Sequence, residues 1–245
     1  METIFVGQSV IRLQTVDSTN KYAANHLNLP EWTEGTVILA DEQTAGRGRN
    51  NNRWESEPGS NLLMSVVFRP TFIIPQELFT LSMGVALAVA DTLRFFNLPD
   101  VSIKWPNDVL SGEQKLAGIL IENQLRGNRA HTAIVGIGLN VNQLHGFPDR
   151  GSSIARICGR NTDKEEVFNH LCLRLERRYL ELRSDVGKMV NAYNEQLFAL
   201  GTYRAYQFDR IEHAVLKEVK PTGQAVFNTQ QGVSMHDMNS VKWLW

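Results

Sequence analysis

Residues 43–54 read QTAGRGRNNNRW, a stretch that combines two glycines with three arginines and contains no acidic residue. Glycine lets backbone N–H groups come close to a ligand, and the arginine fork binds phosphate and carboxylate oxygens in pairs. Apolar runs typical of strands lie on both sides, at residues 36–40 and 61–68. We therefore expect a strand–loop–strand unit whose loop binds an anion.

The composition is that of an ordinary globular protein. The chain has 245 residues, 42% of them hydrophobic, and a formal net charge of −1, which argues against a general nucleic-acid-binding protein. Cys158 and Cys172 lack the spacing of metal ligands or of a disulfide framework, so we expect reduced, buried side chains. The N-terminus does not resemble a signal peptide, and the apolar run at residues 83–90 is too short to cross a bilayer. We expect a soluble cytoplasmic protein.

Hydrophobic periodicity divides most of the chain into strands and helices. Alternating or continuous apolar runs predict strands at residues 10–16, 36–40, 61–68, 101–105, 115–122 and 132–141. Apolar residues spaced three and four apart predict helices at residues 77–96, 162–183 and 186–200. From residue 203 the pattern changes to short β-type runs separated by turns, which predicts a small SH3-like barrel. We expect a large domain over residues 1–200 and a barrel domain over residues 201–245.

Polar residues follow several of these strands. DSTN at residues 17–20 contains residue types that cap helices, and the spacing alone favours a cap over a binding site. Pro106 ends the strand at residues 101–105, so Asn107 and Asp108 are expected at a strand mouth, although Asp108 also suits an Asx turn.

Two strands carry glycines that leave room for a ligand. Period two places Lys115 and the odd-numbered residues of the strand 115–122 on one face, and Gly118 leaves a gap on the other. Lys115 also suits a solvated strand end. In the strand 132–141, Gly136, Gly138 and Asn140 share a face, and the Asn140 amide needs either a ligand or a turn as its partner.

Common catalytic and nucleotide-binding motifs are absent: the sequence has no Walker A, HExxH, GxSxG or Rossmann glycine pattern. Trp54 and Trp105 are the aromatic side chains best placed to stack on a base, and core packing is the alternative for each. These residues alone do not identify a reaction.

Five motifs, in this order, resemble those of the biotin protein ligases. They are DSTN at 17–20, AGRGR at 45–49 with Trp54 after it, KWPNDV at 104–109, KLAGILIE at 115–122 and GIGLNVN at 136–142. The resemblance covers almost the whole chain. It implies an α+β fold, with a central mixed β-sheet flanked by helices, like a class II synthetase, and a C-terminal SH3-like barrel. It also implies formation of biotinyl-5′-AMP from biotin and ATP, and transfer of biotin to a lysine of a biotin carboxyl carrier protein.

The resemblance implies a role for each motif. Ser18, Thr19, Asn20 and Gln43 would hold the biotin rings; Arg47, Gly48 and Arg49 would cradle the acyl phosphate; Lys115 would contact both carboxylate and phosphate beside Gly118. Trp54 would cover the adenine, and Asn107 and Asn140 would bind the nucleotide. Lys115, Arg47 and Arg49 would supply the catalytic positive charge, and Asp108 would orient the carrier amine or accept its proton. Mg²⁺ is expected with ATP, with its ligands unassigned.

The sequence departs from the family pattern directly after Arg49. A basic residue and a glycine are common there in the family, whereas this chain has Asn50, Asn51 and Asn52. Asparagine tolerates the left-handed conformation, so we expect the turn to survive with less positive charge. Only 16 residues precede Asp17, too few for a winged helix, so we expect a ligase without a DNA-binding domain. A homodimer is compatible with this interpretation.

Two other functions compete with this one. A lipoate or octanoate ligase would share the fold, but its arginine-rich Gly-Gly-Gly signature is not found. A non-catalytic protein that senses biotin or a nucleotide is the second, and the retention of Lys115, Arg47 and Arg49 argues against it. The chain also lacks the Met-Lys-Met signature of a carrier domain.

Overall fold

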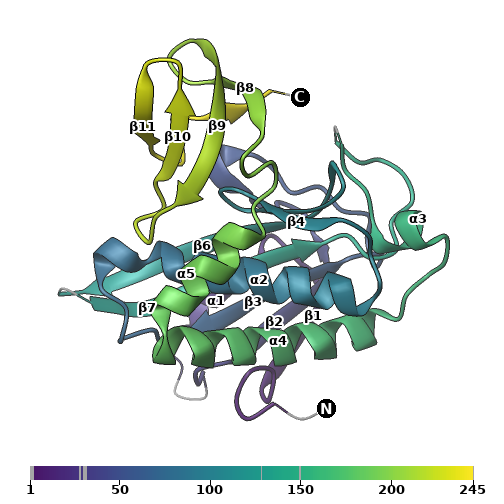
Figure 1. The fold of residues 1–245 in the computed structure, drawn as a ribbon. Coiled ribbons are helices and arrows are strands. Elements are labelled where there is room, and N and C mark those ends of the chain that lie inside the picture. The colour runs from purple at the N-terminus through teal and green to yellow at the C-terminus, as the bar shows by residue number, and fades with distance from the viewer. Residues whose placement is uncertain (1–2, 28, 30–31, 128, 149, 245) are drawn as a thin grey trace.

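The computed structural model describes residues 3–27, 29, 32–127, 129–148 and 150–244. A seven-stranded sheet has the order β1-β2-β3-β7-β6-β5-β4, and a separate five-stranded sheet has the order β11-β10-β9-β8-β12 (Figure 1). The pair β1–β2 is parallel and the other pairs are antiparallel, so the large sheet is mixed. The predicted α+β fold class is confirmed.

The strands of the large sheet are β1 (Val10–Val16), β2 (Val37–Gln43), β3 (Leu62–Phe68), β4 (Val101–Lys104), β5 (Asp108–Ser111), β6 (Gln114–Arg126) and β7 (Arg129–Leu139). Those of the small sheet are β8 (Tyr203–Gln207), β9 (Ile211–Val219), β10 (Ala225–Thr229), β11 (Gly232–His236) and β12 (Lys242–Trp243). The helices are α1 (Thr19–His26), α2 (Phe79–Phe95), α3 (Ile154–Cys158), α4 (Lys164–Ser184) and α5 (Val186–Glu195), with short 3₁₀ turns at Arg49–Asn51 and Pro75–Glu77.

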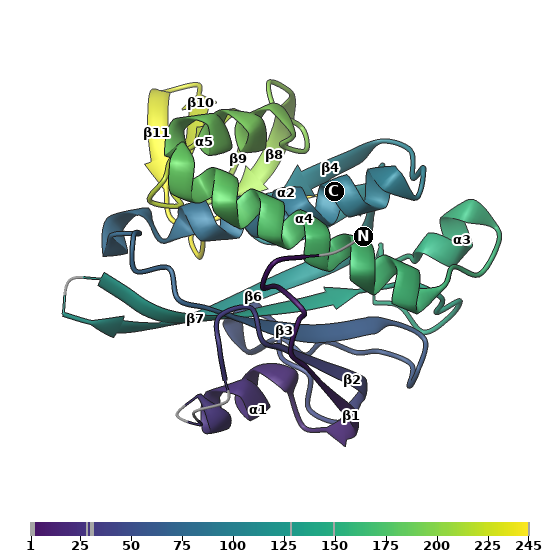
Figure 2. The same cartoon turned by 90° about the horizontal axis from the view of Figure 1, so that it is seen from below.

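Helices cover both faces of the large sheet. Figure 2 shows α2, α4 and α5 on one side of it and α1 on the other, where α1 contacts β2, β3 and β7. The segment Pro75–Phe95 has 21 residues and is long and apolar enough to cross a membrane, with a mean hydropathy of 1.4 over 18 of them, but 72% of that 18-residue stretch is buried inside the fold. It therefore serves as the central core helix, which explains why it is apolar all round.

Strand β6 differs from the predicted strand in one respect that matters for the site. Leu110 of β5 pairs with Lys115, but the preceding Val109 pairs with Ala117, so Leu116 is an extra residue that forms a β-bulge. The bulge turns Lys115 to the face that carries Gly118, and its methylene Cε lies 3.5 Å from the position of a Cβ on Gly118. The expectation that these two residues lie on opposite faces is wrong.

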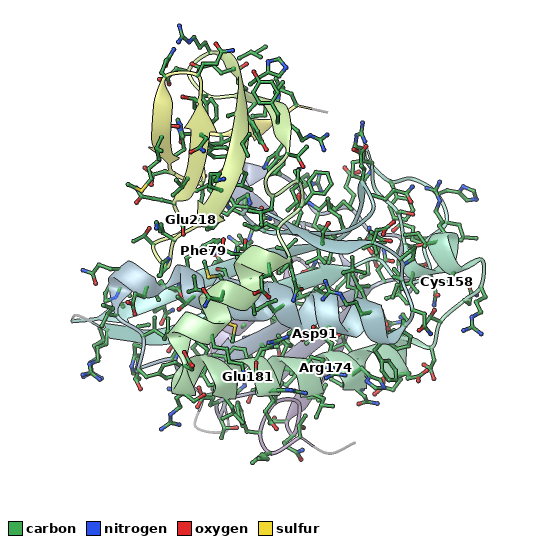
Figure 3. All side chains as sticks on the ribbon, viewed as in Figure 1. Phe79, Asp91, Cys158, Arg174, Glu181 and Glu218 are labelled. Carbon is green, nitrogen blue, oxygen red and sulfur yellow. The ribbon has the colours of Figure 1, made fainter. Side chains whose placement is uncertain are left out.

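Two further expectations need correction. Strand β5 was not predicted; Asp108 is its first residue and pairs with Lys104 across the β4–β5 hairpin. Cys172 is buried as expected, but Cys158 is exposed at the end of α3, on the outer edge of the molecule (Figure 3).

The small sheet packs against the β4–β5 hairpin and α5 (Figure 1). Two tryptophans connect it to the large sheet: Trp105 Nε1 donates to the Gly223 carbonyl at 3.0 Å, and Trp243 Nε1 donates to the Trp105 carbonyl at 2.9 Å. Both indole rings are buried, so these bonds fix the end of β4 to the small sheet. The division into domains at residues 200 and 201 stays a prediction.

Candidate active site

A cavity of about 710 Å³ lies between the large sheet and the small one. It is lined by most of the residues predicted for the site, brought together from four segments: Ser18, Thr19, Asn20, Gln43, Arg47, Gly48, Arg49, Trp54, Asn107, Asp108, Lys115 and Gly118. Strand ends and their connecting loops meet here, which is why motifs up to 100 residues apart converge.

The glycine–arginine loop is folded as a short hairpin. Trp54 N–H donates to the Gly46 carbonyl at 3.0 Å, and Gly48 N–H donates to the Asn52 carbonyl at 2.7 Å. At the tip, Asn50 has φ 54° and ψ 41°, the left-handed conformation. The turn therefore survives without the family's glycine, as expected from the tolerance of asparagine for this region.

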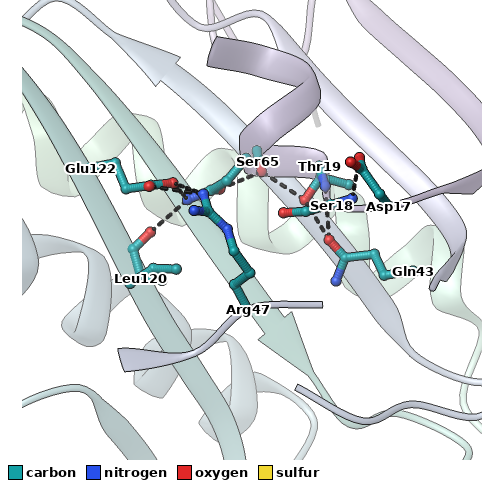
Figure 4. A network of polar contacts seen from close by, with 9 residues as sticks. Asp17, Ser18, Thr19, Gln43, Arg47, Ser65, Leu120 and Glu122 are labelled. Carbon is teal, nitrogen blue, oxygen red and sulfur yellow. Dashed lines mark hydrogen bonds and ion pairs between the residues drawn. The ribbon is translucent and has the colours of Figure 1, made fainter. Parts of the chain in front are cut away.

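One end of the cavity is lined by the uncharged residues Ser18, Thr19, Asn20 and Gln43. Figure 4 shows the polar network to which they belong. Gln43 Oε1 accepts from the Thr19 backbone N–H at 2.8 Å and lies 3.1 Å from the Thr19 hydroxyl. Because a backbone N–H can only donate, the Gln43 oxygen must face Thr19, which leaves the amide nitrogen for other partners. Within the described residues Gln43 Nε2 makes no hydrogen bond, so it can donate to a ligand in the cavity.

The same network continues from Asn20 to the loop (Figure 4). The Ser65 hydroxyl lies 2.6 Å from Asn20 Oδ1, and Asn20 Nδ2 donates to Glu122 Oε2 at 2.8 Å. Arg47 Nη2 donates to both Glu122 oxygens, at 2.8 and 2.7 Å. Arg47, predicted to supply charge to an acyl phosphate, is thus paired with a carboxylate. Sequence reasoning missed Ser65, which lies in none of the motifs, and Glu122, which ends the motif at residues 115–122 but was given no role.

The other end of the cavity carries a cluster of cations around one carboxylate. Asp108 Oδ1 lies 2.6 Å from Lys115 Nζ, and Asp108 Oδ2 lies 3.7 Å from Lys104 Nζ. Burial lowers the pKa of Lys104, although the nearby Asp108 charge opposes this, and burial likewise lowers the pKa of Arg49. Partly desolvated cations attract an anion more strongly than exposed ones do. Lys104 was not predicted for the site; its pairing with Asp108 depends on the β4–β5 hairpin.

Trp54 lies on a bed made by two glycines. Gly118 and Gly138 are directly opposite each other on β6 and β7. A Cβ on Gly118 would lie 2.7 Å from the indole, and one on Gly138 would lie 2.3 Å from it. The gap predicted at Gly118 is therefore filled by Trp54. Lys115 Nζ lies 5.5 Å from the centre of the same ring.

The small sheet supplies a wall of the cavity that was not predicted from the sequence. Its contributing residues are Gln207, Phe208, Met238, Asn239, Ser240, Val241, Lys242 and Trp243. Arg49 Nη2 donates to Asn239 Oδ1 at 2.8 Å, so the loop and the small sheet are in direct contact.

Asn140 is the predicted site residue that does not line the cavity. Its side chain is buried, and Nδ2 donates to the Ser152 carbonyl at 2.9 Å. The geometry thus favours the alternative in which Asn140 stabilises a turn. Asn107 does reach the cavity, and its Nδ2 lies 3.3 Å from the Ile119 carbonyl. In the described part of the chain, no group of three or more His, Cys, Asp or Glu side chains could hold a metal ion.

Comparisons with known proteins agree with this geometry. Residues 12–140 match the model of the biotin/lipoate A/B protein ligase family. The chain is 32% identical over 241 residues to the bifunctional ligase/repressor BirA of Bacillus spizizenii, covering 95% of this chain and 73% of that protein. It is 37% identical over 174 residues to the biotin–[acetyl-CoA-carboxylase] ligase of Paracoccus denitrificans, covering 65% of this chain and 68% of that one.

The chain spans 56% of BirA from Bacillus subtilis, to which it is 36% identical. Among solved structures, the biotin protein ligase of Aquifex aeolicus in complex with biotin and ATP superposes with a TM-score of 0.79 at 27% identity. That match covers 96% of this chain and 98% of the Aquifex chain. The chain therefore belongs to the biotin/lipoate A/B protein ligase family, and within it to the biotin protein ligases.

Proposed function

We propose that this protein activates biotin with ATP to biotinyl-5′-AMP and then transfers biotin to a lysine of a biotin carboxyl carrier protein. The observation that carries the proposal is the division of one cavity into an uncharged end around Gln43 and a cationic end around Lys115. Biotin has the same division, because its ring system is neutral and its side chain ends in a carboxylate.

At the uncharged end, the ureido group of biotin needs both donors and acceptors. Gln43 Nε2 is free to donate to the ureido oxygen, since Thr19 occupies the amide oxygen. Ser18, Thr19 and Asn20 line the cavity beside it. Asn20 and Thr19 both contact the Ser65 hydroxyl. A lipoyl or octanoyl group has no polar atoms to match this network and would leave buried groups unpaired, which disfavours such ligands strongly.

At the cationic end, a biotin carboxylate oxygen would attack the α-phosphorus of ATP, and pyrophosphate would leave. Both reactants are anions, so positioning and charge neutralisation should dominate catalysis. Arg49, Lys104 and Lys115 would supply the positive charge. Arg47 is paired with Glu122, so Arg47 and Gly48 would instead help to close the loop.

Trp54 would cover the adenine with the ring face that does not rest on the glycine bed. Asn107 would contact the nucleotide from the β4–β5 turn. Asn140 would affect nucleotide binding only indirectly, because its hydrogen bond to the Ser152 carbonyl holds a loop in place. Mg²⁺ would accompany ATP; Asp108 is the one carboxylate among the described lining residues, which suits a metal held mainly by phosphates and water.

In the second step the carrier amine would attack the acyl carbonyl, and AMP would leave. Asp108 would orient that amine or accept its proton, because it lines the cavity within 2.6 Å of Lys115. We further propose a cytoplasmic location. A homodimer stays a prediction from the family resemblance.

The test is ATP–pyrophosphate exchange measured in parallel with biotin, lipoate and octanoate. We expect exchange with biotin alone, and exchange with lipoate but not biotin would refute the proposal. Lys115→Ala should lower kcat/KM by about 100-fold or more, as removal of a transition-state charge partner does. Lys217→Ala, on the exposed side of β9, is the matched control and should retain full activity.

A further inference from the structure

Glu122 of β6 joins the loop to the start of α1 without lining the cavity itself. Its carboxylate receives three hydrogen-bond contacts, two from Arg47 Nη2 and one from Asn20 Nδ2, at 2.7–2.8 Å. Arg47 lies on the loop and Asn20 in the first turn of α1. A single carboxylate therefore connects two segments that line the uncharged end of the cavity.

We infer that Glu122 is a positioning residue that holds the loop closed over the biotin rings by way of Arg47. The inference rests on the proposed function and extends it to Glu122, a residue of the motif at 115–122 to which the resemblance gave no role. The contacts run from Gln43 to the Thr19 backbone N–H, and from the Thr19 hydroxyl through the Ser65 hydroxyl to Asn20 Oδ1 (Figure 4). Asn20 Nδ2 then donates to Glu122, whose carboxylate accepts from Arg47. Gln43 and Arg47 are four residues apart in the chain, so the network forms a closed ring at the base of the loop.

The exposure of the pair suits a contact that opens and closes. The Arg47 side chain is 46% exposed and that of Glu122 is 38% exposed, so water and salt weaken their attraction. Such a pair can be broken when biotin enters. Asn20, by contrast, is buried, and its bond to Glu122 keeps the carboxylate directed at the loop.

Glu122→Gln tests this role because glutamine has almost the same shape as glutamate but carries no charge. Glutamine has a single acceptor oxygen, and its amide group would face an N–H donor of either Arg47 or Asn20. We expect biotin to dissociate about fivefold faster, in line with the loss of a partly exposed charged contact. The KM for biotin should rise by the same factor, with kcat at saturating biotin and the KM for ATP unchanged.

A higher KM for biotin with an unchanged kcat would not follow from general damage to the fold. Arg47→Gln should reproduce it, and the double variant should show no further loss because both changes break one contact. Glu165→Gln is the matched control, since it breaks an Arg–Glu pair of 2.6 Å and similar exposure between β1 and α4, away from the cavity. It should leave the biotin off-rate unchanged.

The measurements are biotin dissociation by stopped flow at low and high salt, together with pyrophosphate exchange. In the wild-type protein, high salt should speed dissociation, and in Glu122→Gln this salt effect should be lost. An unchanged off-rate in Glu122→Gln and Arg47→Gln, with wild-type protein active on biotin, would overturn the inference. Wild-type protein that neither binds nor activates biotin would refute the proposed function instead.

Discussion

Gly138→Ala should displace Trp54 and weaken ATP binding while the fold stays intact. A Cβ at this position would lie 2.3 Å from Trp54 Cε2 and 2.6 Å from Cζ2, whereas ordinary contacts begin at 3.4 Å. The indole would have to retreat by about 1 Å. Strand β7 can accept alanine, since the new methyl group points into the cavity and the loop that carries Trp54 can move outward.

The expected magnitude follows from the stacking that is lost. Stacking of a base on an aromatic side chain contributes about 1–3 kcal/mol, which corresponds to about 5- to 150-fold in affinity. A ring displaced by about 1 Å keeps part of this contact, so we expect the KM for ATP to rise about tenfold. The free energy of unfolding should change by less than about 1 kcal/mol, because alanine loses less backbone entropy than glycine on folding.

The assay is pyrophosphate exchange against ATP concentration at saturating biotin, with thermal unfolding of the same samples. Gly84→Ala is the control, because its Cβ would meet Met189 Sδ at an ordinary 3.7 Å and should change neither quantity. In a Trp54→Ala background, Gly138→Ala should have no further effect on the KM for ATP. If Gly138→Ala raised the KM for biotin but not the KM for ATP, the prediction would be refuted. Trp54 on its two glycines would then contact biotin and not the nucleotide.

Two further predictions concern titrating groups. Burial lowers the pKa of Lys104 from its ordinary 10.5, so its charge is lost at a lower pH than that of an exposed lysine. Adenylate formation should therefore fall on the alkaline side below pH 10.5, and Lys104→Arg should shift that fall upward in a pH–rate profile. Burial raises the pKa of the Cys172 thiol to about 12, so iodoacetamide at pH 8 should alkylate Cys158 alone. Intact mass should then show one added group, with full activity.

Much of the fold could be predicted because long elements carry their periodicity in the sequence. The strand predicted at residues 10–16 matches β1, and the helix predicted at residues 77–96 lies within three residues of α2 at each end. The convergence of the motifs was also predictable. Polar residues that follow β1 and β4 within a few positions line the same cavity, as Asn20 and Asp108 do.

The remaining features depend on contacts between distant segments. The bulge at Leu116 adds one residue to β6 and reverses the face of Lys115, and no periodicity within the strand signals it. Arg47 and Glu122 are 75 residues apart, and Arg49 and Asn239 are 190 apart. A loop rich in arginine predicts an anion site, but which arginine meets a carboxylate is decided by the sheet register.

The two arginines of the loop have different tasks because they point in opposite directions. Gly48 between them is extended, with φ −114° and ψ −171°, so Arg47 turns to Glu122 on the large sheet and Arg49 to Asn239 on the small one. The charge of Arg47 is balanced by Glu122. Arg49 has only a neutral amide as its hydrogen-bond partner there, and its guanidinium is partly desolvated.

The charge of Asp108 offsets part of this desolvation, but Arg49 forms no close ion pair within the described residues. An entering phosphate would recover the rest of the desolvation free energy. Asn50 and Asn52 at the hairpin tip add hydrogen-bonding amides to the cavity wall but no charge. Nucleotide binding should therefore depend on Arg49, Lys104 and Lys115. The replacement of the family's basic residue by asparagine should cost less than the loss of any one of these three.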